Sequence, residues 1–185
     1  MSQSVTASRN GMRFAQGDME TNQRAVISAL VDNESGVLAR VVGLFSGRGY
    51  NIESLTVAPV SDNGSMSRIN IVTSGTVAIL EQICAQLDRL VPVCRVVNLT
   101  ECGPHIAREM ALIKVVSAGE ARTEALRIAQ AFRARAVDTT ARSFVFELTG
   151  ATDKIDSFIE LMAPLGLAEV SRTGVAALIR GPQTI

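Results

Sequence analysis

The residues best suited to bind a small ligand stand together in one polar turn. Asn33, Glu34, Ser35 and Gly36 separate an apolar run, 24–31, from a stretch with helical periodicity. Asn33 or Ser35 is the expected N-cap, and the first N–H groups of a helix attract carboxylates. Gly36 allows close approach to the main chain, and the Asn33 amide can donate or accept a hydrogen bond. The turn predicts a site for a small zwitterion; an ordinary capped turn is the alternative that spacing leaves open.

A second polar position follows the helix. Asn51 and Ile52 open the next extended segment, just after Gly47 and Gly49 end the helical pattern. If two copies of the chain pair through this region, the helix start of one copy can face the second strand of the other. The shared cleft would offer amides for a carboxylate, an asparagine for an ammonium group and aliphatic walls for a side chain. These groups favour binding of a metabolite over its chemical conversion.

Composition excludes several classes of function. The chain has 185 residues, 47% of them hydrophobic and only 4% aromatic, and its 18 basic residues balance its 18 acidic residues. A neutral chain lacks the positive field with which nucleic-acid-binding proteins gather phosphates, so no nucleic-acid partner is expected. No apolar run approaches the roughly 20 residues of a membrane span, so no membrane association is expected. A charge near zero favours self-association.

The three cysteines indicate neither a metal site nor catalysis. An odd number of cysteines in a chain without a secretory signal predicts reduced thiols and a cytoplasmic location. Cys84 and Cys94 are expected to be small buried hydrophobes. The spacing of Cys94, Cys102 and His105 matches no common zinc pattern, and His105 has no evident nucleophile to activate. We therefore expect no catalytic residue, metal ligand or cofactor in this chain.

The apolar pattern divides the chain into a tail and two similar modules. Residues 1–23 are polar and aperiodic, which predicts a disordered tail. The first module should contain a strand, helix, strand, strand, helix and strand at 24–31, 36–46, 50–60, 66–74, 77–90 and 93–99. After a linker at 100–108, the second should repeat that order at 109–117, 120–132, 135–139, 143–149, 152–162 and 167–179. The expected fold class is α+β, with two tandem ferredoxin-like βαββαβ modules.

This architecture leaves surface to be covered. Each sheet should carry helices on one face only, so its other face or an edge strand needs a partner. Self-association is the simplest way to cover such a surface.

Several segments also resemble a known family. The run DNESGVLARVVGLFSGRGYNIESLTVAPV is similar to the start of the regulatory (small) subunit of acetohydroxyacid synthase, also called acetolactate synthase. LEQICAQLDRLVPVCRVVNLTE, REMALIKV, FRARAVD and KIDSFIELMAPLGLAEVSRTGVAALIRG fit the same family. The resemblance extends over residues 25–181 almost without a gap. It departs from the family pattern at the hairpin 61–65 and the junction 102–105.

The resemblance implies a regulatory role. It makes residues 24–99 an effector-binding ACT domain and 109–181 a ferredoxin-like C-terminal domain. It implies a homodimer joined through its ACT domains, feedback inhibition by valine or a related branched-chain amino acid, and activation of a catalytic (large) subunit. Thiamine diphosphate, Mg²⁺ and FAD would belong to that partner, with no cofactor in this chain.

The family motif also assigns the effector site. Asn33, Gly36, Val37 and Leu38 should come from one chain, and Asn51 and Ile52 from its neighbour. Some family members have proline in place of Ser35, which changes the stiffness of the turn but leaves the site unchanged.

Other functions fit the residues less well. A stand-alone ACT-type sensor that regulates another enzyme or transcription is the main alternative. The glycines at 43, 47 and 49 lie at a helix end, where a dinucleotide-binding loop would not place them. The second and third strands lack the aromatic residues of an RNA-binding sheet, apart from Tyr50. The arginines between 122 and 142 are either solvated or a contact surface for the catalytic subunit.

Overall fold

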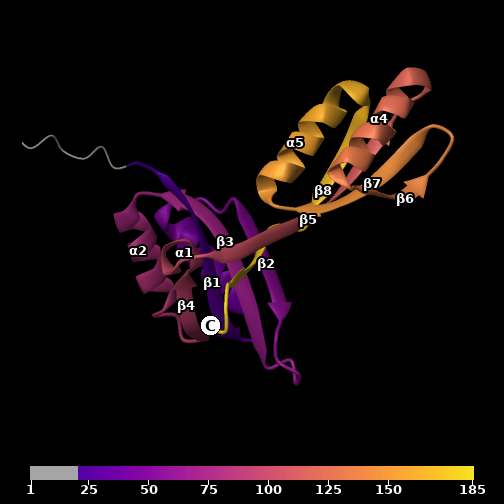
Figure 1. Cartoon of the computed structure of the whole chain (residues 1–185). Coiled ribbons are helices and arrows are strands. Elements are labelled where there is room, and N and C mark those ends of the chain that lie inside the picture. Colours follow the sequence, from indigo (N-terminus) through magenta and orange to yellow (C-terminus); the bar gives the residue numbers. More distant parts are fainter. Residues whose placement is uncertain (1–20) are drawn as a thin grey trace, which may run out of the picture.

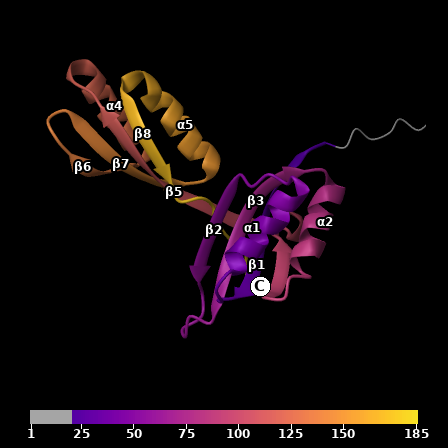
Figure 2. The same ribbon diagram turned by 180° about the vertical axis from the view of Figure 1, so that it is seen from behind.

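The computed structural model describes residues 21–185 of the chain. The tail expected at 1–23 therefore lies outside the described residues except for its last three positions, and Gln23 already belongs to the first strand. Figure 1 shows two modules joined by one long strand, with the C-terminus lying against the first module. Each module has a pair of helices on one face of its sheet, as the reverse view in Figure 2 also shows.

The first module has the predicted order of elements. They are β1 (Gln23–Asp32), α1 (Val37–Arg48), β2 (Ser54–Pro59), β3 (Met66–Gly75), α2 (Val77–Leu87) and β4 (Val93–Asn98). The strands form an antiparallel sheet in the order β2-β3-β1-β4. Gly49 caps the C-terminus of α1, with a φ of 71°, a left-handed conformation that glycine adopts without steric cost. Thr76 caps α2 by accepting a hydrogen bond from the Ile79 N–H.

The second module repeats the order with one addition. Its elements are β5 (His105–Val116), α4 (Gly119–Phe132), β6 (Arg135–Thr139), β7 (Ser143–Gly150), α5 (Thr152–Met162), the short helix η1 (Ala163–Leu165) and β8 (Leu167–Arg172). The sheet order is β6-β7-β5-β8. A further strand, β9 (Ala176–Ile179), pairs with the first part of β5. The α+β class and the tandem ferredoxin-like modules are confirmed.

Each module has its own aliphatic core between sheet and helices. In the first, the odd-numbered side chains of β1 and β3 face α1 and α2, as period-2 alternation requires. This core contains Ala25, Ile27, Ala29, Val31, Val37, Val41, Phe45, Ile69, Ile71, Leu80, Ile83 and Leu87. The second core contains Ala111, Ile113, Val115, Ala125, Ala129, Phe144, Phe146, Leu148, Ile155, Phe158 and Met162.

A third core shows how the open face of the first sheet is covered. Val26 and Val72, on the face opposite the helices, pack against Leu99, Val175 and Ala177. The chain thus covers part of this face with β9, where the sequence suggested self-association. The segment expected as a linker, 100–108, contains regular structure. The short helix α3 (Leu99–Cys102) fills its first part, and β5 begins at His105, so 105–108 is strand paired with β9.

Two smaller expectations also need correction. The strand expected at 50–60 begins only at Ser54, so Asn51 and Ile52 precede it rather than open it. Cys94, on the edge strand β4, is exposed rather than buried; this strand packs Val93 and Val96 against the first core, but not Cys94. Cys84 is half-buried against the first core, as its helical position indicated.

Candidate functional site

The polar turn after β1 exposes the start of α1. The N-cap is Gly36, with a φ of 87°, and no side chain caps the helix, so the expected capping by Asn33 or Ser35 is wrong. The N–H of Val37 donates to the Glu34 carbonyl, at 3.3 Å. Within residues 21–185, the N–H groups of Leu38 and Ala39 donate to no protein acceptor. These free donors at the positive end of a helix suit a carboxylate.

Asn33 is held in place by the neighbouring hairpin. Its Nδ2 donates to the Gly64 carbonyl at 2.8 Å, and its N–H donates to the Ser65 carbonyl at 2.7 Å. The asparagine therefore joins the β1–α1 turn to the β2–β3 hairpin. Its side chain is exposed, and Asn33 precedes Gly36, the N-cap of α1, by three positions.

The remaining residues expected at this end differ in their roles. The side chain of Val37 is buried in the first core, which leaves it only main-chain atoms to offer a ligand. Leu38 is 40% exposed and presents an aliphatic surface beside the free N–H groups. Among these residues, the structure thus brings together Asn33, Gly36 and Leu38 as surface groups.

Asn51 and Ile52 lie at the other end of α1. The helix has 12 residues, which at 1.5 Å per residue separates its ends by about 18 Å. Thr73 Oγ1 donates to the Asn51 carbonyl at 2.6 Å, the Asn51 side chain is exposed, and Ile52 is half-buried against the first core. One chain therefore does not bring the two halves of the expected site together; a shared pocket requires a second copy.

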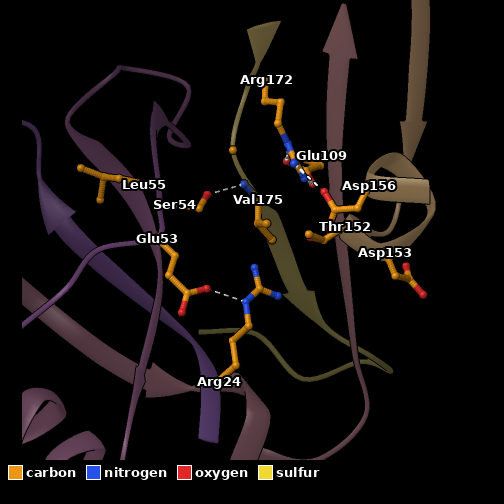
Figure 3. A pocket seen from close by; sticks show the side chains of 11 residues that line it. Arg24, Glu53, Ser54, Leu55, Glu109, Thr152, Asp153, Asp156, Arg172 and Val175 are labelled. Carbon is orange, nitrogen blue, oxygen red and sulfur yellow. Dashed lines mark hydrogen bonds and ion pairs between the residues drawn. The ribbon is translucent and has the colours of Figure 1, made fainter. Parts of the chain in front are cut away.

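A polar cleft between the two modules was not predicted from the sequence (Figure 3). It has a volume of about 720 Å³ and is lined by Arg24, Glu53, Ser54, Leu55, Glu109, Thr152, Asp153, Asp156, Arg172, Gly174 and Val175. Arg172 forms ion pairs with both Glu109 and Asp156, the latter at 2.6 Å. Partners up to 63 positions apart give no local signal in a sequence.

Charge interactions shift the pKa values of two groups in this cleft. A hydrogen bond from Ser74, then the ion pair with Arg24 at 2.7 Å, lowers the pKa of Glu53. This carboxylate therefore stabilises the fold above the ordinary glutamate pKa, and that contribution is lost as the pH falls through the lowered value. The hydrogen bond to Glu109 raises the pKa of Arg172, which remains charged at every physiological pH.

No metal-binding cluster of His, Cys, Asp and Glu side chains is found among residues 21–185.

The pKa of the Cys84 thiol is raised to about 11, mainly by burial. No helix in this part of the chain is long and apolar enough to cross a membrane.

Comparison with known proteins identifies the family. Residues 27–95 match the family model of the small-subunit-like ACT domain of acetohydroxyacid synthase, and residues 108–181 match the model of the small subunit of acetolactate synthase. The chain is 47% identical over 163 residues to the acetolactate synthase small subunit of Haemophilus influenzae, covering 88% of this chain and 99% of that protein. The chain belongs to the acetolactate synthase small-subunit family.

Other members of the family support this assignment. The isozyme 3 small subunit of Escherichia coli is 45% identical to the chain, with 85% of this chain and 96% of that protein covered. The crystal structure of the acetolactate synthase small subunit from Thermotoga maritima superposes with a TM-score of 0.77 at 35% identity, covering 87% of this chain and 99% of that one. The acetolactate synthase small subunit therefore shares both modules with this chain.

Proposed function

We propose that this chain is the regulatory subunit of an acetolactate synthase, which activates a separate catalytic subunit and makes it sensitive to valine. Membership of the small-subunit family supports the regulatory role. The observation that carries the effector proposal is the uncapped start of α1 at Gly36, with its free N–H groups beside Asn33 and Leu38. Catalysis, with thiamine diphosphate, Mg²⁺ and FAD, is assigned to the cytoplasmic partner chain.

In this proposal, valine binds where two ACT domains meet. Its carboxylate accepts hydrogen bonds from the N–H groups of Leu38 and Ala39 at the start of α1. Asn33 of the same chain and Asn51 of the second chain hold the polar end of the amino acid. Leu38 and the second chain's Ile52 contact the branched side chain. Each homodimer would contain two such pockets, related by the twofold axis.

Binding regulates only if it favours one arrangement of the complex over another. Valine must therefore bind more tightly to the less active arrangement. Coupling between two sites is typically worth about 1–3 kcal/mol, and it is reciprocal for binding. The active complex should consequently weaken valine binding by the same factor by which valine disfavours the active complex.

Reconstitution tests the proposal directly. The purified chain is mixed with the catalytic subunit of the same organism, and acetolactate formation from pyruvate is measured over a range of valine concentrations. We expect higher activity with the chain than without it, and inhibition by valine only when the chain is present. Calorimetric titration of the chain alone with valine, leucine and isoleucine ranks the effectors. Equal activity with and without the chain would refute the activating role.

A further inference from the structure

The segment between β8 and β9, residues 173–175, is bonded to both modules. We call it the crossover. On the side of the first module, Ser54 Oγ accepts a hydrogen bond from the Val175 N–H at 2.8 Å. Thr56 Oγ1 donates to the Val175 carbonyl at 3.0 Å. Two side chains of β2 thus hold both polar main-chain groups of Val175, whose own side chain is buried in the third core.

Gly174 allows β2 and the crossover to approach closely. Its φ is 84°, and a Cβ placed on it would lie 2.7 Å from Ser54 Oγ and 3.0 Å from Thr56 Cγ2. Carbon atoms in contact normally stay about 3.5–4.0 Å apart, so any side chain here would push the crossover away from β2. Glycine is therefore required by both the conformation and the contact.

On the other side, the crossover is fixed to the second module. The Thr173 N–H donates to the Met110 carbonyl at 3.0 Å, and Thr173 Oγ1 accepts from the Met110 N–H at 3.1 Å. The preceding residue, Arg172, forms its ion pairs with Glu109 on β5 and Asp156 on α5 (Figure 3). The Glu109 side chain is only 3% exposed, so moving Arg172 away would leave a buried carboxylate unpaired.

The first-module end of this connection adjoins half of the effector site. Ser54 is the first residue of β2 and follows Ile52 by two positions. Between them, Glu53 is anchored by its N–H to the Val72 carbonyl at 2.8 Å and by its carboxylate to Arg24. Only Glu53 separates residues 51–52 from Ser54, so a displacement of 51–52 is passed to Ser54 through this single hydrogen-bonded residue.

We propose that the contact of Ser54 with Gly174 and Val175 is the joint through which the effector segment, residues 51–52, acts on the C-terminal module. This inference rests on the proposed function and specifies how its signal leaves the ACT domain. A shift of Ser54 moves the crossover, and the crossover moves Arg172 with its partners on β5 and α5. Ser54 and Gly174 are positioning residues in this scheme, since neither belongs to the effector pocket.

A matched pair of glycine variants tests the joint. Gly174→Ala places a methyl group against Ser54, whereas Gly181→Ala has nearly the same backbone angle, with a φ of 88°, and no atom within 4 Å of the new Cβ. Amide hydrogen exchange is measured on both full-length variants without ligand. We expect faster exchange at residues 51–56 in Gly174→Ala only. Equal exchange of this segment in the two variants would overturn the inference.

Inhibition measurements then separate the joint from the pocket. In the complex with the catalytic subunit, Gly174→Ala should lower the fold-inhibition reached at saturating valine by about tenfold, within the range of typical coupling. Its valine affinity as an isolated chain should stay close to that of the wild type. An equal loss of affinity and inhibition would place Gly174 in the pocket and overturn the joint. If valine does not inhibit the wild-type complex, the proposed function is refuted. The hydrogen-exchange comparison would still test the contact of Ser54 with Gly174 and Val175.

A milder variant applies if Gly174→Ala does not fold. Ser54→Ala removes the acceptor of the Val175 N–H without adding any atom. We expect faster exchange at Val175 and weaker inhibition by valine. Ser171→Ala, an exposed serine of β8, is the control. Wild-type exchange at Val175 in Ser54→Ala would count against the joint, because the hydrogen bond would then restrain nothing.

Discussion

Gly36 combines two properties that a carboxylate site at a helix start requires. Its left-handed φ of 87° turns the chain into α1 without a capping side chain, and nothing lies within 4 Å of the position that a Cβ would occupy. Hence the N–H groups of Leu38 and Ala39 in the first turn stay open to a ligand. A side chain at residue 36 would stand in that open space and would strain the backbone by about 1–2 kcal/mol.

Gly36→Asp should abolish sensitivity to valine while leaving activation intact. The new carboxylate would repel the carboxylate of the effector and would itself accept hydrogen bonds from the free N–H groups. Half-inhibition of the reconstituted enzyme should require at least about tenfold more valine, equivalent to about 1.4 kcal/mol. Gly119→Asp is the matched control, because Gly119 also begins a helix with a positive φ, 59°, and open space around it. Equal valine sensitivity in the two variants would remove Gly36 from the site.

Cys84 should be the least reactive of the three thiols. With its pKa raised to about 11 by burial, it is about 0.1% thiolate at pH 8, and the thiolate is the reactive form. Cys94 and Cys102 are exposed. Titration of the native chain with a disulfide reagent should therefore show two faster thiols and one slow one, and Cys84→Ser should remove only the slow phase. Rapid labelling of Cys84 in peptide mass mapping would contradict its half-buried position.

Among the elements, β9 contacts both modules. It follows the last strand of the second module, yet its buried side chains belong to the core against the first sheet. Successive side chains of a strand point to opposite sides. Ala177 accordingly is 3% exposed, while its neighbour Leu178 is 55% exposed. This alternation permits a test of the covering strand with two adjacent residues.

Ala177→Asp should destabilise the protein strongly and Leu178→Asp only slightly. The first places an unpaired carboxylate in an apolar core, which we expect to lower the free energy of unfolding by about 2–4 kcal/mol. The second adds a charge to the surface and should change it by no more than about 0.5 kcal/mol. Urea denaturation followed by circular dichroism measures both. Similar values for the two variants would mean that β9 does not cover the first sheet.

The sequence predicted most elements because their patterns are long and local. Both βαββαβ repeats could be established from the turn at 61–64 and from the helical spacing in α1, α2, α4 and α5. The start of β5 and the role of β9 were missed for a physical reason. Gly103 and Pro104 are typical of a loop, and residues 105–108 become strand only by pairing with residues 176–179, which lie some 70 positions away.

The candidate site was predictable in part for the same reason. Asn33, Gly36 and Leu38 lie within six positions, so one turn of sequence suffices to group them. The N-cap was mispredicted because side-chain preference favours Asn33 or Ser35, whereas Asn33 instead bonds the distant Gly64. The interdomain cleft depends on the packing of whole modules, which no local pattern encodes.

At the scale of the whole molecule, the proposed effector pocket requires two chains. The two halves of the expected site lie at opposite ends of α1, about 18 Å apart along a helix of 12 residues. No rotation of side chains closes that gap. A pocket built from both halves is therefore possible only across a dimer, where each chain contributes one half to each of two sites.

Mixed dimers should recover binding that neither variant has alone. Gly36→Asp damages one half of the pocket, and Asn51→Ala, at an exposed position, damages the other without affecting the fold. A dimer of one chain of each kind contains one doubly damaged and one intact pocket. After free exchange of subunits, half of all dimers are mixed, so calorimetry should find about a quarter of the wild-type number of valine sites.

Two variants of the same half provide the control. Asn33→Ala and Gly36→Asp both alter the β1–α1 turn, so no dimer of these two chains contains an intact pocket. We expect no recovery of valine binding from this mixture, although its subunits exchange equally well. Recovery in the control would show that Asn33 and Gly36 do not belong to the same half of the pocket. No recovery with Gly36→Asp and Asn51→Ala would show that each chain binds the amino acid by itself. The 18 Å between the halves would then exclude either the turn or Asn51 from the site, because one valine cannot reach both.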